Sequence, residues 1–170
     1  MRRLSLLFAA GFALLPAPSI AAPVSSSPPA TTRAQILVPL TLTKNNDLSF
    51  GTVVPSALSG AVSINATSGA RTIVGGVTGV PSDAGGRATF STVGSSNQQV
   101  IVTLTQPPAL TSLAGDTVPV LALTLDGSPL RTIDPTTRTF SFGIGGIILI
   151  GADQPEGVYQ ATFDVTATYL

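Results

Sequence analysis

The feature that most constrains the fold is a strict alternation of side chains in the closing stretch, GVYQATFDVTATYL. Odd-numbered positions from 159 to 169 are apolar or aromatic, and even-numbered positions are polar. A period of two puts successive side chains on opposite faces of a strand, so that one face is buried. We therefore expect residues 158–169 to form a closing strand. Its expected core-facing residues are Tyr159, Phe163, Val165 and Tyr169.

A second alternation lies near the other end of the chain, where Ile36, Val38, Leu40 and Leu42 occupy one parity. Pro39 has no N–H to give to a ladder and indicates an edge or a break. Two interpretations remain open for residues 36–42. They form either the first strand of this domain or a strand donated to a neighbouring molecule, and the closing strand could meet either one.

Short β-branched or alternating segments recur between these two stretches, separated by clusters of Gly, Pro, Asn and Asp. No segment after residue 22 has a helical period with caps. The pattern predicts an all-β protein, an antiparallel sandwich or barrel. The run FGIGGIILIG lacks the spacing of a nucleotide-binding loop and predicts a buried strand bent at Gly145 and Gly146.

The N-terminus has the pattern of a secretory signal peptide: two arginines, an apolar run and small residues up to Ala21. The run is shorter than the roughly 20 apolar residues of a membrane-spanning helix. We predict a signal peptide over residues 1–21, a flexible Pro/Ser/Thr-rich leader over 22–33 and a single domain over 34–170. The protein is then exported to the periplasm, the cell surface or the extracellular space, with no membrane span in the mature chain.

Composition excludes several classes of function. Removal of the first 21 of the 170 residues leaves six basic residues against eight acidic ones, which argues against a nucleic-acid partner. Cysteine and histidine are both absent, so disulfides, thiolate sites, common zinc sites and Ser-His-Asp catalysis are excluded.

Carboxylate side chains are the remaining candidates for catalysis or metal binding. Asp153 and Glu156 share one predicted loop, and other aspartates lie in further loops, namely Asp47, Asp83, Asp116, Asp126 and Asp134. Two carboxylates suffice for glycoside hydrolysis, but the chain has no Trp to line a sugar cleft. Loop aspartates commonly cap their own turns. We therefore expect no enzymatic activity, no cofactor and no metal site.

Two stretches carry a resemblance to a known family: DLSFGTVVP at residues 47–55 and QPEGVYQATFDVTATY at residues 154–169. They resemble the bacterial exported proteins catalogued as domain of unknown function 4402, and the resemblance covers about residues 34–170. Gln160-Ala161 and Ala167 depart from the family pattern. The same motifs are similar, more weakly, to spore coat protein U-type subunits and chaperone–usher pilins. That likeness implies an immunoglobulin-like (pilin-like) sandwich, here of about 7–9 strands.

The resemblance defines no catalytic or binding residues. It favours an exported structural or surface-interaction protein, such as a fimbria-like subunit that joins itself or a related subunit by β-strand addition. The alternatives are a periplasmic glycan- or metal-binding module and a small outer-membrane β-barrel. Most predicted strands are shorter than the roughly 9–11 residues that a membrane-spanning strand requires.

Overall fold

The computed structural model describes residues 28–170, so the predicted signal peptide lies outside the described residues. The chain divides into two units, Met1–Gln35 and Ile36–Leu170. Residues 28–35, the described part of the first unit, are exposed and contain no helix or strand. The second unit is built from strands, and within residues 28–170 there is no helix long and apolar enough to cross a membrane.

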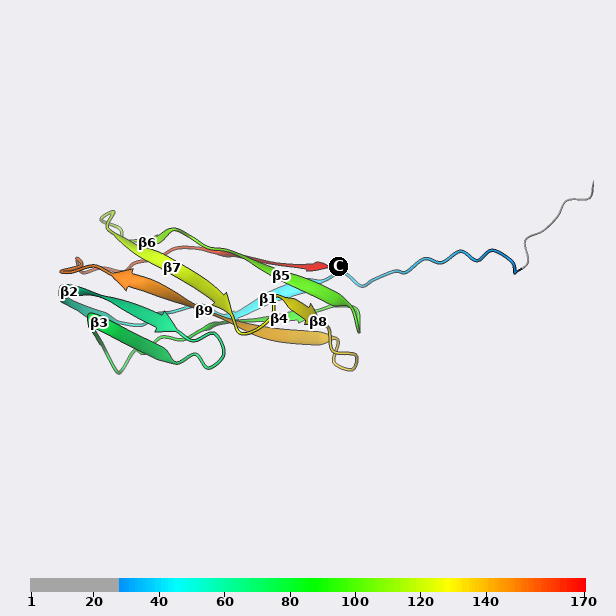
Figure 1. Cartoon of the computed structure of the whole chain (residues 1–170), viewed down its shortest axis with the longest axis horizontal. Coiled ribbons are helices and arrows are strands. Elements are labelled where there is room, and N and C mark those ends of the chain that lie inside the picture. The colour runs from blue at the N-terminus through cyan, green and yellow to red at the C-terminus, as the bar shows by residue number, and fades with distance from the viewer. Residues whose placement is uncertain (1–27) are drawn as a thin grey trace, which may run out of the picture. The chain divides into compact units, whose positions relative to one another are not determined.

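Ten strands make up the second unit, and every pairing between them is antiparallel (Figure 1). They are β1 (Thr41–Asn46), β2 (Val53–Ile64), β3 (Arg71–Gly79), β4 (Ala88–Val93), β5 (Gln99–Thr105), β6 (Ala109–Thr111), β7 (Thr117–Leu125), β8 (Leu130–Thr132), β9 (Thr139–Ile150) and β10 (Asp164–Tyr169).

The strands form two sheets. The larger has the order β1-β4-β9-β2-β3, with β7 also pairing with β9 and β6 with β7. The smaller has the order β10-β5-β8. The predicted all-β, antiparallel sandwich is confirmed. The number of strands, ten, exceeds the expected 7–9. The sequence did not indicate β6 and β8, because each has three residues and lies in a segment without a clear alternation.

The glycine-rich run predicted as a buried strand is β9, at the centre of the larger sheet. Residues 139–144 of β9 pair with β4, residues 146–150 with β2 and residues 144–148 with β7. Ile144 has partners in both β4 and β7, and Gly146 has partners in both β2 and β7. Strands β4 and β2 therefore lie end to end along one edge of β9, and β7 lies along the other.

Gly145 occupies the junction between the β4 and β2 halves of β9. The backbone of residues 64–66 passes directly over it. A Cβ at this position would overlap the carbonyl oxygen of Ile64 and lie 2.6 Å from the nitrogen of Ala66. Glycine is required here because the neighbouring atoms are backbone and cannot rotate away.

The core has two parts. The first core cluster joins β2, β3, β7 and β9 through Val62, Val77, Val118, Val120, Ile148 and Ile150. The second core cluster consists of Ala88, Phe90, Val102, Phe142 and Ile144. Val102 comes from the smaller sheet and the other four come from β4 and β9, so the second core cluster joins the two sheets. Its Phe90 and Phe142 rings stack with centroids 5.4 Å apart.

Candidate functional site

The closing strand is shorter than predicted. Strand β10 covers Asp164–Tyr169, and of residues 158–163 only Gln160 pairs, through an isolated bridge to Thr111. The reason lies in the partner strand, because Pro107 and Pro108 follow the end of β5 at Thr105 after one intervening residue. Proline has no N–H, so the ladder between β5 and β10 ends at the pair Thr105–Asp164.

The four residues expected on the buried face of the closing strand are all half-buried. Phe163 and Val165 pack against the second core cluster. Tyr159 packs against the first core cluster instead, and its hydroxyl donates to the carbonyl of Pro155 at 2.7 Å. Tyr169 accepts a hydrogen bond from the Ser95 N–H at 2.7 Å and donates one to the carbonyl of Val38 at 2.9 Å.

Within its own domain, the segment 36–42 is a strand only from Thr41 onward, beyond the break that Pro39 indicated. Strand β1 begins at Thr41, which pairs with Val93, the last residue of β4. Beyond that pair β4 offers no further partner. Of the four alternating residues, Leu42 lies in β1 and packs against the second core cluster. Leu40 is half-buried, Val38 is 45% exposed and Ile36 is 94% exposed.

Residues 38–40 are nevertheless attached to their own domain. The Val38 N–H donates to Ser95 Oγ at 2.8 Å, and the Val38 carbonyl accepts from Tyr169. Strand β1 belongs to the larger sheet and β10 to the smaller, so the closing strand does not pair with the domain's first strand. Its partner is β5.

Strand β10 uses only one of its two edges within residues 28–170. The Leu170 N–H donates to the carbonyl of Gln99 at 3.1 Å, and alternate residues of an antiparallel pair point their backbone groups the same way. Residues 164, 166 and 168 therefore bond to β5. The hydrogen bonds from β5 to the neighbourhood of β8 use even-numbered residues, such as Val102 to Pro129, which leaves the odd-numbered residues of β5 for β10.

The backbone groups of Val165, Ala167 and Tyr169 consequently point away from the sheet. They have no backbone partner among residues 28–170. We call this row of unpaired groups the β10 edge.

A groove lies beside the β10 edge, between β10 and strands β1 and β4. Its volume is about 340 Å³, and its lining comprises Leu42, Lys44, Asp47, Phe90, Ala161, Thr162, Phe163, Asp164 and Val165. The apolar members include residues that pack against the second core cluster. Lys44 and Asp47 form an exposed ion pair in the lining. An open edge beside an apolar groove can accept an extended segment, because the edge supplies backbone bonds and the groove takes alternate side chains.

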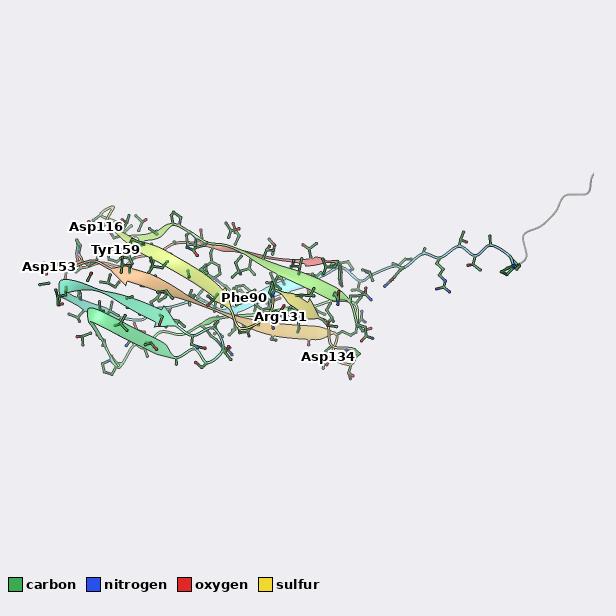
Figure 2. The ribbon with its side chains drawn as sticks, viewed as in Figure 1. Phe90, Asp116, Arg131, Asp134, Asp153 and Tyr159 are labelled. Carbon is green, nitrogen blue, oxygen red and sulfur yellow. The ribbon has the colours of Figure 1, made fainter. Side chains whose placement is uncertain are left out.

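The loop carboxylates do not converge. Figure 2 shows Asp116 and Asp153 at one end of the strand layers and Asp134 toward the other end. Asp47 pairs with Lys44, and Asp83 accepts from the Thr52 hydroxyl at 2.7 Å. Within residues 28–170 no three acidic side chains gather closely enough to hold a metal ion.

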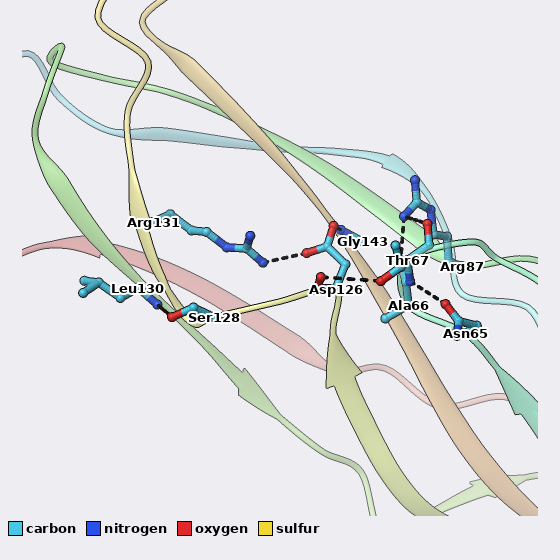
Figure 3. Close-up of polar contacts among 9 residues, drawn as sticks. All are labelled: Asn65, Ala66, Thr67, Arg87, Asp126, Ser128, Leu130, Arg131 and Gly143. Atoms are coloured by element: carbon cyan, nitrogen blue, oxygen red, sulfur yellow. Dashed lines mark hydrogen bonds and ion pairs between the residues drawn. The ribbon is translucent and has the colours of Figure 1, made fainter.

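Asp126 has a structural environment (Figure 3). Its Oδ1 contacts Arg131 at 2.6 Å, and its Oδ2 accepts from the Gly143 N–H of β9 at 2.8 Å. Nearby, the Arg87 guanidinium donates to the carbonyls of Ala66 at 2.8 Å and of Thr67. Both oxygens of Asp126 are therefore engaged in positioning the chain around β9.

Asp134 caps its own turn. Its Oδ1 accepts from the N–H groups of Thr136 at 2.8 Å and Thr137 at 2.7 Å. These backbone hydrogen bonds, that from Thr137 first, hold the pKa of Asp134 below its ordinary value because they favour the ionised form.

We expect Asp134→Ala to destabilise the protein at neutral pH by an amount that shrinks in acid. The native pKa is lowered, so the stabilisation is complete above the unfolded-state value of about 3.9 and is lost as the pH falls through the native pKa. Urea unfolding from pH 7 to pH 2 measures the difference. Asp134→Asn is the matched control, since it keeps an acceptor oxygen but cannot titrate. A wild-type advantage over Asp134→Ala that is constant with pH contradicts the capping role.

Comparison with known proteins gives one match. A family model described as "Domain of unknown function (DUF4402)" matches residues 40–169, a span that contains β1, β10 and the groove between them. Neither the curated proteins nor the solved structures give a match.

Proposed function

The chain belongs to the family described as Domain of unknown function (DUF4402), and on that premise we propose that it is an exported structural or surface-interaction protein that assembles by β-strand addition. It acts without catalysis, in the periplasm, at the cell surface or outside the cell. The partner strand comes from another copy or from a related subunit, in the manner of a fimbria-like protein. The observation that carries the proposal is the β10 edge.

The β10 edge lacks the protection that natural sheets give to exposed edges. Charged side chains, prolines, bulges and shortness are the usual devices. Strand β1 carries Lys44 and a bulge before Asn46, β3 begins with Arg71 and has a register shift against β2, and β8 has three residues. Strand β10 instead has six consecutive pairs with β5 without a register shift, no Pro and no Lys, and its one charged side chain is that of Asp164 at the first position. Such an edge favours addition of another strand.

The carboxylate arrangement supports a function without catalysis. Asp126, Asp134 and Asp47 each have a structural partner of their own. General acid–base work on a sugar requires two carboxyl groups that flank one bond, about 5 to 9.5 Å apart. In Figure 2, Asp134 lies toward the opposite end of the domain from Asp116 and Asp153, so it cannot share such a site with either of them.

The chain's own residues 36–42 are a poor donor for a neighbour. Leu42 is packed in its own core, and both backbone groups of Val38 are engaged within the same domain. Donation of this segment would break those contacts, so they support the interpretation that residues 36–42 serve their own domain.

The proposal predicts that Ala167→Pro abolishes assembly and leaves the fold intact. The N–H of Ala167 faces away from β5, so its loss breaks no bond within the domain but interrupts the β10 edge. Wild-type and variant are compared by size exclusion with light scattering and by circular dichroism. We expect a folded monomer for Ala167→Pro and a larger species for the wild type.

Thr166→Pro is the matched control. The N–H of Thr166 faces β5, so this change removes a ladder bond, leaves its acceptor on β5 unpaired and should cost about 1–3 kcal/mol of stability. A wild-type protein that stays monomeric at all concentrations, or an assembly that Ala167→Pro leaves unchanged, rules out addition at the β10 edge.

A further inference from the structure

We propose that the strand added to the β10 edge is the β10 strand of a second copy, related to the first by a two-fold axis through Ala167. This inference rests on the proposed function and names its partner. The two smaller sheets then become one sheet of six strands, with the order β8-β5-β10 continuing into β10-β5-β8 of the second copy.

Antiparallel pairing of β10 with itself satisfies the unpaired backbone groups completely. The outward-facing residues are Val165, Ala167 and Tyr169, and hydrogen-bonded pairs can form only between residues of this set. Centring the axis on Ala167 pairs Val165 with Tyr169 of the second copy, Ala167 with Ala167, and Tyr169 with Val165. This register uses all three residues of both strands. A shift by two residues in either direction leaves one member of the set on each strand without a partner in it, and a shift by one residue opposes outward-facing residues to inward-facing ones.

The side chains agree with this register. On the buried face, an aromatic residue meets a β-branched one at both ends, a favourable cross-strand combination, and the smallest side chain lies at the axis. On the exposed face, Thr166 meets Thr168, and the Asp164 side chain meets the Leu170 side chain. No two charged side chains are therefore directly opposite each other, an arrangement that would destabilise the pairing if the charges were alike.

The second copy also reaches the groove. Val165 is both the first member of the outward-facing set and part of the groove lining. The register brings Tyr169 of the second copy beside Val165, so the interface extends toward two apolar residues of the groove lining, the exposed Ala161 and the half-buried Phe163. The pairing therefore covers part of the apolar surface next to the edge.

A single cysteine tests the axis directly, because the chain contains none of its own. In a hydrogen-bonded antiparallel pair the Cα atoms lie about 5.5 Å apart, within the range that a disulfide spans. We expect purified Ala167→Cys to form a covalent dimer under mild oxidation on a non-reducing gel, and a reductant to return it to the monomer. Far-ultraviolet circular dichroism confirms that the variant is folded.

Two further variants control for random collision. Thr166→Cys alone should give no covalent dimer on the non-reducing gel, because in this register Thr166 faces Thr168 and not itself. A mixture of Thr166→Cys and Thr168→Cys should give the mixed dimer. The inference is overturned if Ala167→Cys does not cross-link, or if Thr166→Cys cross-links equally well.

These outcomes separate the inference from the proposed function. A wild-type assembly that Ala167→Pro dissolves, without cross-linking of Ala167→Cys, means that the edge accepts a different strand. The proposed function then stands and the two-fold pairing is wrong. If Ala167→Pro leaves the assembly unchanged, both the proposed strand addition at the β10 edge and the two-fold pairing are wrong.

Discussion

Gly145→Ala is expected to lower the free energy of unfolding by about 3 kcal/mol or more, which is a large part of the roughly 5–15 kcal/mol that holds a domain together. The added methyl group would overlap the Ile64 carbonyl oxygen and lie 2.6 Å from the Ala66 nitrogen. Both are backbone atoms in the segment that crosses β9, so relief requires β9 and residues 64–66 to move apart. Urea unfolding followed by circular dichroism measures the change.

Gly86→Ala is the control for this prediction. A Cβ at Gly86 would meet nothing within 4 Å, and this residue does not adopt a positive φ. We expect its effect to stay within about 0.5 kcal/mol, as for an ordinary surface substitution. Equal effects of the two substitutions would show that the crossing of residues 64–66 over β9 does not restrict Gly145.

Phe163→Asp is expected to destabilise the domain by about 3–5 kcal/mol. The ring packs against the second core cluster, which joins the two sheets. The substitution removes that apolar contact and places a carboxylate against aromatic and aliphatic side chains. The loss approaches the whole stability of a marginal domain, so we expect largely unfolded protein at 37 °C by circular dichroism and near-complete cleavage in limited proteolysis.

Thr162→Asp is the matched substitution on the neighbouring residue. Thr162 is exposed, so the same carboxylate meets water, and the expected change is within about 0.5 kcal/mol. Comparable losses at positions 162 and 163 would reverse our assignment of the buried face.

The faces of the closing stretch could be predicted from its alternation, because burial of one face of a strand imposes a period of two. Phe163 and Val165 pack toward the core as this period requires. The length of the strand could not be predicted in the same way. It depends on Pro107 and Pro108, about 55 residues away in the sequence, which follow the partner strand and end the ladder. Periodicity within one stretch carries no information about its partner.

The strand with which each edge strand pairs could likewise not be predicted from the sequence. Residues 36–42 and 158–169 both alternate, and nothing in either pattern indicates that β1 belongs to one sheet and β10 to the other. The start of β1 at Thr41 follows from the end of β4 at Val93, a tertiary constraint. Pro39 gave a local signal of a break, and that signal was correct about the position where the regular strand could not extend.

The residues of the groove beside the β10 edge could also be predicted only in part. Its apolar side chains could be listed in advance from their alternation, as for Phe163, Val165 and Leu42. The contribution of Phe90 to the groove could not, because it comes from β4 and reaches the site only when the two sheets pack together.

The central place of β9 in the larger sheet has a consequence for the time course of folding. Strands β2 and β4 can pair with β9 only after residues 139–150 have been synthesised, and β5 can pair with β10 only after residues 164–169 have been synthesised. Each sheet therefore depends on contacts between distant parts of the chain. Closure of such long loops has an entropic cost before any contact compensates for it, and domains dominated by these contacts fold in milliseconds to seconds. A chain emerging from the ribosome therefore cannot complete either sheet until nearly all of the domain has been synthesised. For the export that we propose, this delay is an advantage, because the chain remains extended long enough to be threaded across a membrane.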